Sequence, residues 1–161
     1  MGRQAQVHLV DDAATAAAGA ALALSLAGGD SVALVGDLGA GKTTFVAGLV
    51  AELGGGAAAS PTFSLINDYP GGRLRVWHVD LYRLEREGEL AELGLDDLFG
   101  DRRGVVLVEW ADKFDVMPAD HLRLELSHVP GDGQGRRLVV SSTGPRGEAL
   151  AVALASSGEA R

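Results

Sequence analysis

The sequence contains no cysteine, which excludes structural disulfides, thiolate zinc sites and cysteine nucleophiles. A reducing compartment is compatible with that absence, and we expect a cytoplasmic protein. With 161 residues, the chain is long enough for one domain to bury a hydrophobic core without cross-links or structural metals.

Positive charge is scarce, and lysine above all, since Lys42 and Lys113 are the only two lysines. Fourteen Lys and Arg residues stand against 22 Asp and Glu residues, which gives a net charge of −8. A protein that binds a nucleic-acid backbone by itself needs a basic face. We therefore expect no DNA binding, and contact with RNA only through a partner.

Long hydrophobic runs are also missing. The Ala-rich stretch from residue 13 to residue 27 is apolar, but it is too short and too weakly hydrophobic to span a bilayer. Residues 1–6 carry one charge and no apolar core, and so resemble neither a signal peptide nor a membrane anchor. We expect no membrane association.

The most informative stretch runs from Val32 to Thr44, where an apolar run leads into G-x-x-x-x-G-K-[ST] and then into residues at helical spacing. This is the context that a phosphate-binding loop requires. Glycines in such a loop let backbone N–H groups turn toward an anion, and the next helix points its N-terminus at the same anion. Lys42 is expected to reach the β- and γ-phosphates of a nucleotide, and the Thr43 hydroxyl to bind Mg²⁺. The expected loop glycines are Gly36, Gly39 and Gly41.

Two carboxylates follow strand-like segments and could complete a Mg²⁺ site with this loop. Glu109 follows the continuous apolar run 105–108, which is typical of a buried central strand. Asp80 follows the run 75–79. Taken singly, each could also be a surface carboxylate at a strand end, and the central strand favours Glu109.

Two further residues allow more than one interpretation. Thr62 follows a Gly/Ala-rich stretch and a proline, so it could lie in a loop that orders around a γ-phosphate and Mg²⁺. Its spacing alone favours a plain turn before a strand. His78 alternates with apolar neighbours, which favours a hydrogen-bonded structural histidine over a catalytic one.

The overall pattern predicts an α/β fold with a mixed sheet, a partly parallel core, antiparallel hairpins and flanking helices. Expected strands are 6–10, 31–35, 63–69, 74–79, 105–108, 121–129 and 138–142, with a turn at 131–135. Expected helices are 11–27, 42–53, 81–99 with breaks at Gly88 and Gly94, and 145–155. We expect residues 1–155 to form a single phosphate-loop domain and residues 156–161 to fray.

Several motifs follow one another in a specific order. Residues 36–45 read G-D-L-G-A-G-K-T-T-F, 60–65 read S-P-T-F-S-L, 78–84 read H-V-D-L-Y-R-L, and 106–110 read V-L-V-E-W. Between the last two stand Glu89, Leu90, Gly94, Leu95, Asp97 and Phe99. Together these motifs resemble the TsaE (YjeE) family of small ATPases.

The resemblance implies a P-loop ATPase that takes part in making the threonylcarbamoyl group on adenosine 37 of tRNAs that read codons starting with A. It implies that the chain binds the TsaD–TsaB pair, that TsaD transfers the group, and that ATP hydrolysis supports repeated turnover. The tRNA would be held by the complex, and Mg²⁺ would accompany ATP.

Position by position, the resemblance assigns the phosphates to Gly39, Ala40, Gly41, Lys42, Thr43 and Thr44. It makes Thr43 a Mg²⁺ ligand, lets Glu109 and Asp80 complete the arrangement of the metal and the attacking water, and places Thr62 in a switch-like loop. Asp12, Thr15 and Arg136 fall where the family approaches the nucleotide. Which carboxylate polarises the water is left open.

Three alternatives remain. A small-molecule kinase would need an arginine-rich lid, for which Arg83 and Arg86 are the only nearby candidates. A GTPase is suggested by the stretch D-K-F-D at 112–115, which lacks the Asn of the guanine-binding pattern N-K-x-D. A nucleotide-gated binding module with little hydrolysis has the same motifs as a slow ATPase, and only turnover separates them.

Overall fold

A computed structural model describes residues 4–56 and 65–159 of the chain. Its strands are β1 (Ala5–Leu9), β2 (Ser31–Val35), β3 (Ile66–Tyr69), β4 (Arg75–Asp80), β5 (Gly104–Glu109), β6 (His121–Val129) and β7 (Asp132–Thr143). Its helices are α1 (Asp12–Ser25), α2 (Lys42–Leu53), the 3₁₀ helix η1 (Glu87–Leu93), α3 (Leu95–Phe99) and α4 (Pro145–Glu159). None of these helices is long and apolar enough to cross a membrane.

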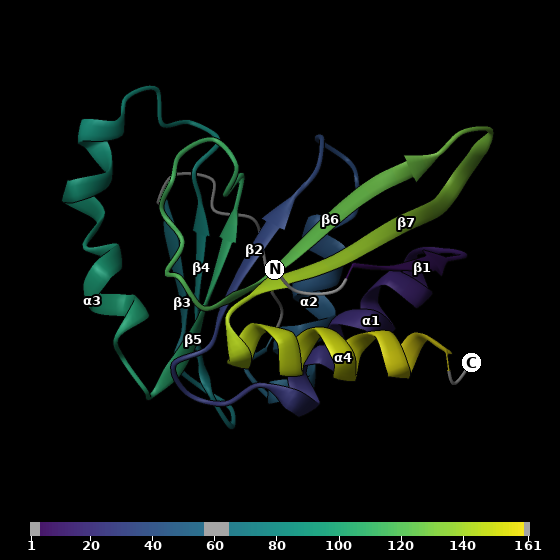
Figure 1. Ribbon diagram of the computed structural model, residues 1–161, viewed down its shortest axis with the longest axis horizontal. Coiled ribbons are helices and arrows are strands. Elements are labelled where there is room, and N and C mark those ends of the chain that lie inside the picture. The colour runs from purple at the N-terminus through teal and green to yellow at the C-terminus, as the bar shows by residue number, and fades with distance from the viewer. Residues whose placement is uncertain (1–3, 57–64, 160–161) are drawn as a thin grey trace.

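The described strands form one seven-stranded mixed sheet in the order β1-β7-β6-β2-β5-β4-β3. Its core is parallel, because β2 pairs in parallel with both β5 and β6, and β5 pairs in parallel with β4. The β3–β4 and β6–β7 pairs and the β1–β7 pair are antiparallel. The arrowheads of β2, β4 and β5 therefore point to the same end of the molecule (Figure 1). This confirms the predicted mixed sheet.

The two faces of the sheet bury separate hydrophobic clusters. Helices α1, α2 and α4 cover one face, and η1 and α3 lie on the opposite side of the sheet (Figure 1). Strand β5 contributes to both clusters, since Val105 and Leu107 belong to one and Val106 and Val108 to the other. Burial on both faces explains why this strand is a continuous apolar run in the sequence.

Local signals set the ends of the helices that position the site. The side chain of Asp11 caps α1 by accepting a hydrogen bond from the backbone N–H of Ala14 at 2.8 Å. Helix α2 ends at Gly54, which adopts a left-handed conformation with φ of 84°. Both boundaries agree with the predicted start and stop residues.

The prediction for residues 81–99 is wrong over 81–86. The chain makes a turn after Asp80, whose carboxylate accepts a hydrogen bond from the backbone N–H of Tyr82 at 2.9 Å, and helix begins only at Glu87. Such a side-chain bond competes with the first turn of a helix. Gly94 breaks the segment as predicted, whereas Gly88 lies inside η1.

Strands β1, β4 and β5 and the end of α1 differ from the predicted bounds by one or two residues. Residues 63 and 64 of the predicted strand 63–69 lie outside the described residues, and β3 begins at Ile66. Two boundaries differ more. Strand β7 begins at Asp132, within the stretch predicted as a turn, because its first residues already pair with the end of β6. Helix α4 continues to Glu159, beyond the predicted end near Ala155.

Helices α1 and α2 approach each other through two glycines. A Cβ atom on Gly19 would lie 2.0 Å from the backbone oxygen of Phe45, and one on Gly48 would lie 2.0 Å from the backbone oxygen of Ala16. Since both obstacles are backbone atoms, no side-chain rotation relieves them. The first turn of helix α2 contributes residues to the candidate site, so the contact between α1 and α2 fixes the position of the site relative to the rest of the domain.

We expect Gly19→Ala to destabilise the fold by about 1–3 kcal/mol, because overpacking outweighs the roughly 1 kcal/mol gained in helix propensity. The matched control is Gly88→Ala, where the added Cβ meets open space and the effect should stay within about 0.5 kcal/mol. Urea unfolding of both variants measures the difference. A Gly19→Ala protein as stable as the control would contradict the close approach.

Candidate functional site

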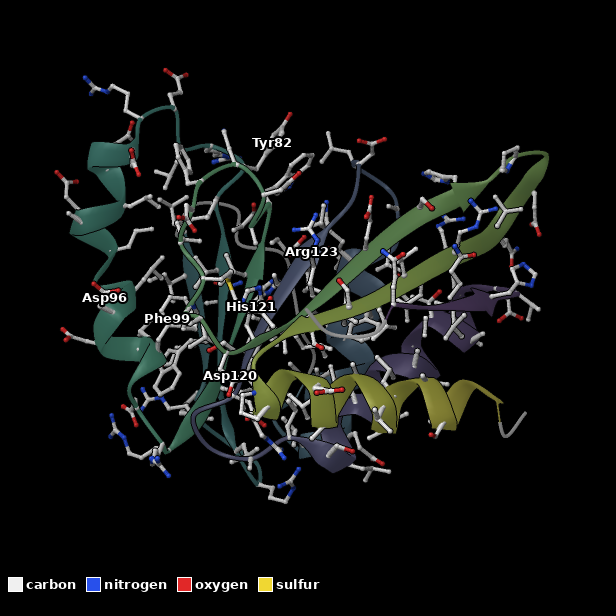
Figure 2. All side chains as sticks on the ribbon, viewed as in Figure 1. Tyr82, Asp96, Phe99, Asp120, His121 and Arg123 are labelled. Carbon is white, nitrogen blue, oxygen red and sulfur yellow. The ribbon has the colours of Figure 1, made fainter. Side chains whose placement is uncertain are left out.

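The predicted loop and the two predicted carboxylates meet at one end of the sheet. The loop follows β2, Asp80 is the last residue of β4, and Glu109 is the last residue of β5. The strand register places Asp80 opposite Glu109, and Glu109 opposite Leu34 of β2. Figure 2 shows Tyr82, which follows Asp80 closely, at this same end of the molecule.

A cavity of about 360 Å³ opens at this end of the sheet. The residues that line it come from the loop, α1, α2, β7 and the ends of β4 and β5: Asp12, Leu38, Gly39, Gly41, Lys42, Thr43, Thr44, Asp80, Tyr82, Glu109, Trp110 and Arg136. Most of the predicted site residues are among them. The cavity therefore combines loop backbone, one lysine, one arginine, hydroxyl groups and three carboxylates.

The loop conformation depends on glycine at two positions. Gly41 precedes α2 with φ of 106°, a left-handed conformation that L side chains rarely adopt. A Cβ atom on Gly36 would lie 2.4 Å from the backbone oxygen of Leu126 in β6. Gly41 is the N-cap residue of α2 and has no side chain to cap it, and the N-terminus of a helix is a favourable position for an anion.

Lys42 is 5% exposed. Its Nζ donates hydrogen bonds to the backbone oxygens of Gly36 and, at 3.5 Å, of Asp37. The same atom lies 4.0 Å from the ring centroid of Trp110. Burial lowers the pKa of Lys42, while nearby carboxylates, Glu109 first, oppose that shift. The ammonium of Lys42 is thus held by neutral groups, two backbone carbonyls and an indole ring, which a phosphate group could replace.

The two carboxylates are held differently. Glu109 is 3% exposed, and its Oε2 accepts a hydrogen bond from Nε2 of His78, which is fully buried. The predicted hydrogen-bonded histidine is therefore confirmed. Asp80 is only partly buried and is bonded to the backbone of Tyr82. Desolvation raises the pKa of Asp80, and the Tyr82 hydrogen bond opposes the shift.

The residues assigned by the resemblance alone lie in different places. Arg136 lines the cavity, and its Nη2 donates a hydrogen bond to the backbone oxygen of Gly39 at 3.2 Å. Asp12 lines the cavity from the first turn of α1. Thr15 is fully buried, and its Cγ2 lies 3.5 Å from where a Cβ on Gly41 would be. Thr15 thus supports the loop from below and does not line the cavity.

Two further predicted residues among those described, like Thr15, do not line the cavity. Ala40 is 1% exposed, and Gly36 supports the loop through its backbone. Thr62 lies outside the described residues.

Trp110 and Tyr82 were missed as cavity residues, although both belong to the sequence motifs. Their ring centroids are 4.9 Å apart. Trp110 has φ of 60°, uncommon for a residue with a side chain, and its N–H donates to the backbone oxygen of Leu34 at 3.0 Å. This left-handed turn places the indole ring of Trp110 over Nζ of Lys42. No local sequence pattern predicts the turn.

The fold defines the class of the protein: it is a mixed α/β protein, with a seven-stranded sheet, flanking helices and a glycine-rich loop that opens into a cavity at one end of the strands. A protein-family model described as "Threonylcarbamoyl adenosine biosynthesis protein TsaE" matches residues 9–138. The chain belongs to the TsaE family, as the motifs indicated.

Individual relatives agree with this assignment. The tRNA threonylcarbamoyladenosine biosynthesis protein TsaE of Bacillus subtilis is 42% identical over 124 residues, covering 76% of this chain and 75% of that protein. The protein of the same name from Nostoc is 36% identical over 140 residues, covering 84% and 85%. The crystal structure of Bacillus subtilis YdiB matches with a TM-score of 0.79 at 33% identity, covering 98% of this chain and 97% of that one.

Proposed function

We propose that this chain binds and hydrolyses Mg²⁺-ATP as a subunit of the machinery that makes threonylcarbamoyladenosine at position 37 of tRNA. The observation that carries the proposal is the meeting of Lys42, Thr43, Asp80 and Glu109 in one cavity of a chain that belongs to the TsaE family. A phosphate loop with carboxylates at the neighbouring strand ends suits nucleotide hydrolysis.

The residues present fit a magnesium ion that arrives with the nucleotide. Thr43 offers a hydroxyl oxygen, and Asp80 and Glu109 offer carboxylate oxygens, from the wall of the same cavity. Within the described residues, no group of three or more His, Asp or Glu could hold a metal. Mg²⁺ is usually bound through few protein oxygens together with phosphates and water. When bound, Mg²⁺ would neutralise charge on the phosphates.

The chain's own residues would then do three things. The N-terminus of α2 and the loop N–H groups would hold the phosphates. Lys42 would turn from the carbonyl of Gly36 toward the β- and γ-phosphates and stabilise charge that develops during in-line attack. One of the two carboxylates, Glu109 or Asp80, would orient the attacking water.

The proposal extends to the partners that the resemblance implies. The chain would act with TsaD and TsaB in the cytoplasm, TsaD would transfer the threonylcarbamoyl group, and tRNA would be held by the complex. The net charge of −8 supports this division, because an acidic chain repels a nucleic-acid backbone.

The test is steady-state ATP hydrolysis by the purified chain, alone and with TsaD–TsaB added, with GTP as a competitor. We expect slow hydrolysis alone, faster hydrolysis with the partners, and little competition from GTP. Turnover that ignores the partners, or that needs a small-molecule acceptor, would contradict the proposed role and favour a kinase. Tight ATP binding with no turnover under any condition would favour a nucleotide-gated module.

A further inference from the structure

His78 is the one histidine in the described residues that is fully buried. It lies in the middle of β4, where the strand register places it opposite Leu107 of β5 and Asn67 of β3. His78 does not line the cavity, but its ring is hydrogen-bonded to Glu109, which does line the cavity. His78 is thus connected to the site through a single carboxylate.

The direction of this hydrogen bond follows from the atoms involved. A carboxylate oxygen accepts, so Nε2 of His78 carries the proton and donates it to Oε2 of Glu109. The other ring nitrogen, Nδ1, is buried and has no hydrogen-bond partner among the described residues. Among the described residues, Glu109 is therefore the one hydrogen-bond partner of this ring.

Stability by itself gives little reason for such an arrangement. Placing an imidazole in a sheet interior desolvates two nitrogens, and only one of them recovers a bond. An apolar side chain of similar size would fill the same space without that cost. The benefit must then lie in what the bond does to Glu109.

A glutamate has three side-chain torsions and can place its carboxylate in several ways. The bond to His78 fixes Oε2 against a ring that is itself held within the sheet, and it leaves Oε1 as the remaining acceptor. Asp80 is held by a backbone group instead, because its Oδ1 accepts a hydrogen bond from the N–H of Tyr82 in the turn after β4. The geometry thus distinguishes the two carboxylates.

We propose that His78 is a positioning residue, which holds the carboxylate of Glu109 in the orientation needed to act on the attacking water or on the Mg²⁺ shell. This rests on the proposed function as an ATPase. Residues that orient such groups from behind typically contribute about 10–100-fold to activity or metal affinity when they are replaced.

The test compares His78→Met with His78→Gln in the full chain, in the presence of TsaD–TsaB. Methionine fills a similar volume without a donor, whereas the amide nitrogen of glutamine can reach the place of Nε2. We expect His78→Met to lower kcat by about 10–100-fold with KM for ATP changed less than about 3-fold. His78→Gln should recover most of that loss. In a Glu109→Gln background, His78→Met should have no further effect.

A second measurement does not depend on turnover. Nitrogen-15 spectra of the imidazole rings, with the His78 signals identified by their loss in His78→Gln, should show the proton on Nε2. That Nε2 proton should shift in Glu109→Gln, where the carboxylate acceptor is gone. A proton on Nδ1 instead, or signals that do not respond to Glu109→Gln, would overturn the inference even if the Met variant fails to fold.

The two proposals fail in different ways. If the unmodified chain hydrolyses ATP and His78→Met retains its kcat, the positioning role is wrong and the proposed function stands. If the unmodified chain never hydrolyses ATP, the proposed function is wrong, and the nitrogen-15 spectra still decide whether His78 holds Glu109.

Discussion

Lys42→Ala is expected to lower kcat/KM for ATP hydrolysis by at least about 10²–10³-fold, the loss that follows removal of one group that stabilises developing charge. The structure strengthens this expectation, because Lys42 is the only lysine that lines the cavity and its ammonium is already buried beside Trp110. The substitution removes the charge and leaves the loop glycines in place. Steady-state phosphate release, with and without TsaD–TsaB, measures the effect.

The matched control is Arg102→Ala. It removes one positive charge as well, but Arg102 lies in the turn before β5, at the other end of the strands. The kcat/KM of the Arg102→Ala variant should stay within about 2-fold of that of the unmodified chain, because salt screens an exposed charge at the end of the strands opposite the cavity. If Lys42→Ala hydrolysed ATP as fast as this control, the phosphate-loop assignment of the cavity would be wrong.

Glu109→Gln is the second substitution with a large expected effect, a fall in kcat of about 10²–10⁴-fold, which is the usual contribution of a positioned general base. We expect it to exceed the effect of Asp80→Asn, which removes the same charge from the neighbouring strand end. Glu109 is nearly fully buried and held by His78, whereas Asp80 is partly exposed and held at a turn. A fixed carboxylate orients water better than a loosely held one.

Kinetics at varied Mg²⁺ concentration distinguish the residue that orients the attacking water from the residue that binds Mg²⁺. Asp80→Asn should chiefly raise the Mg²⁺ concentration needed for half-maximal turnover, while Glu109→Gln should lower kcat at saturating Mg²⁺. The reverse pattern would assign the water to Asp80 and leave Glu109 to the metal.

Much of the fold around the site could be predicted because its signals are local. The segment 31–35 was predicted as a strand and 42–53 as a helix, and both agree with β2 and α2. A glycine at each end of α2, with positive φ, fixes its length without help from distant residues. The segment 81–86 was mispredicted because one side-chain bond, from Tyr82 to Asp80, outweighed a helical composition.

The residues that meet at the candidate site could also be predicted in large part. Lys42 and Thr43 follow from a motif whose residues are contiguous, and Glu109 and Asp80 follow from the rule that parallel strands end at one edge. Thr15, assigned only by resemblance, lies beneath the loop instead of in the cavity wall. The helical pattern of α1 indicates which residues face inward, but not which element they meet.

The sequence by itself determined the loop between β2 and α2, because closely spaced glycines, a lysine and a threonine encode its backbone locally. The tertiary structure decided what surrounds it. Strand register brought Asp80 beside Glu109, burial paired His78 with Glu109, and a left-handed turn placed Trp110 over Lys42. Each of these contacts joins residues from different elements, and its free energy depends on packing that no local pattern encodes.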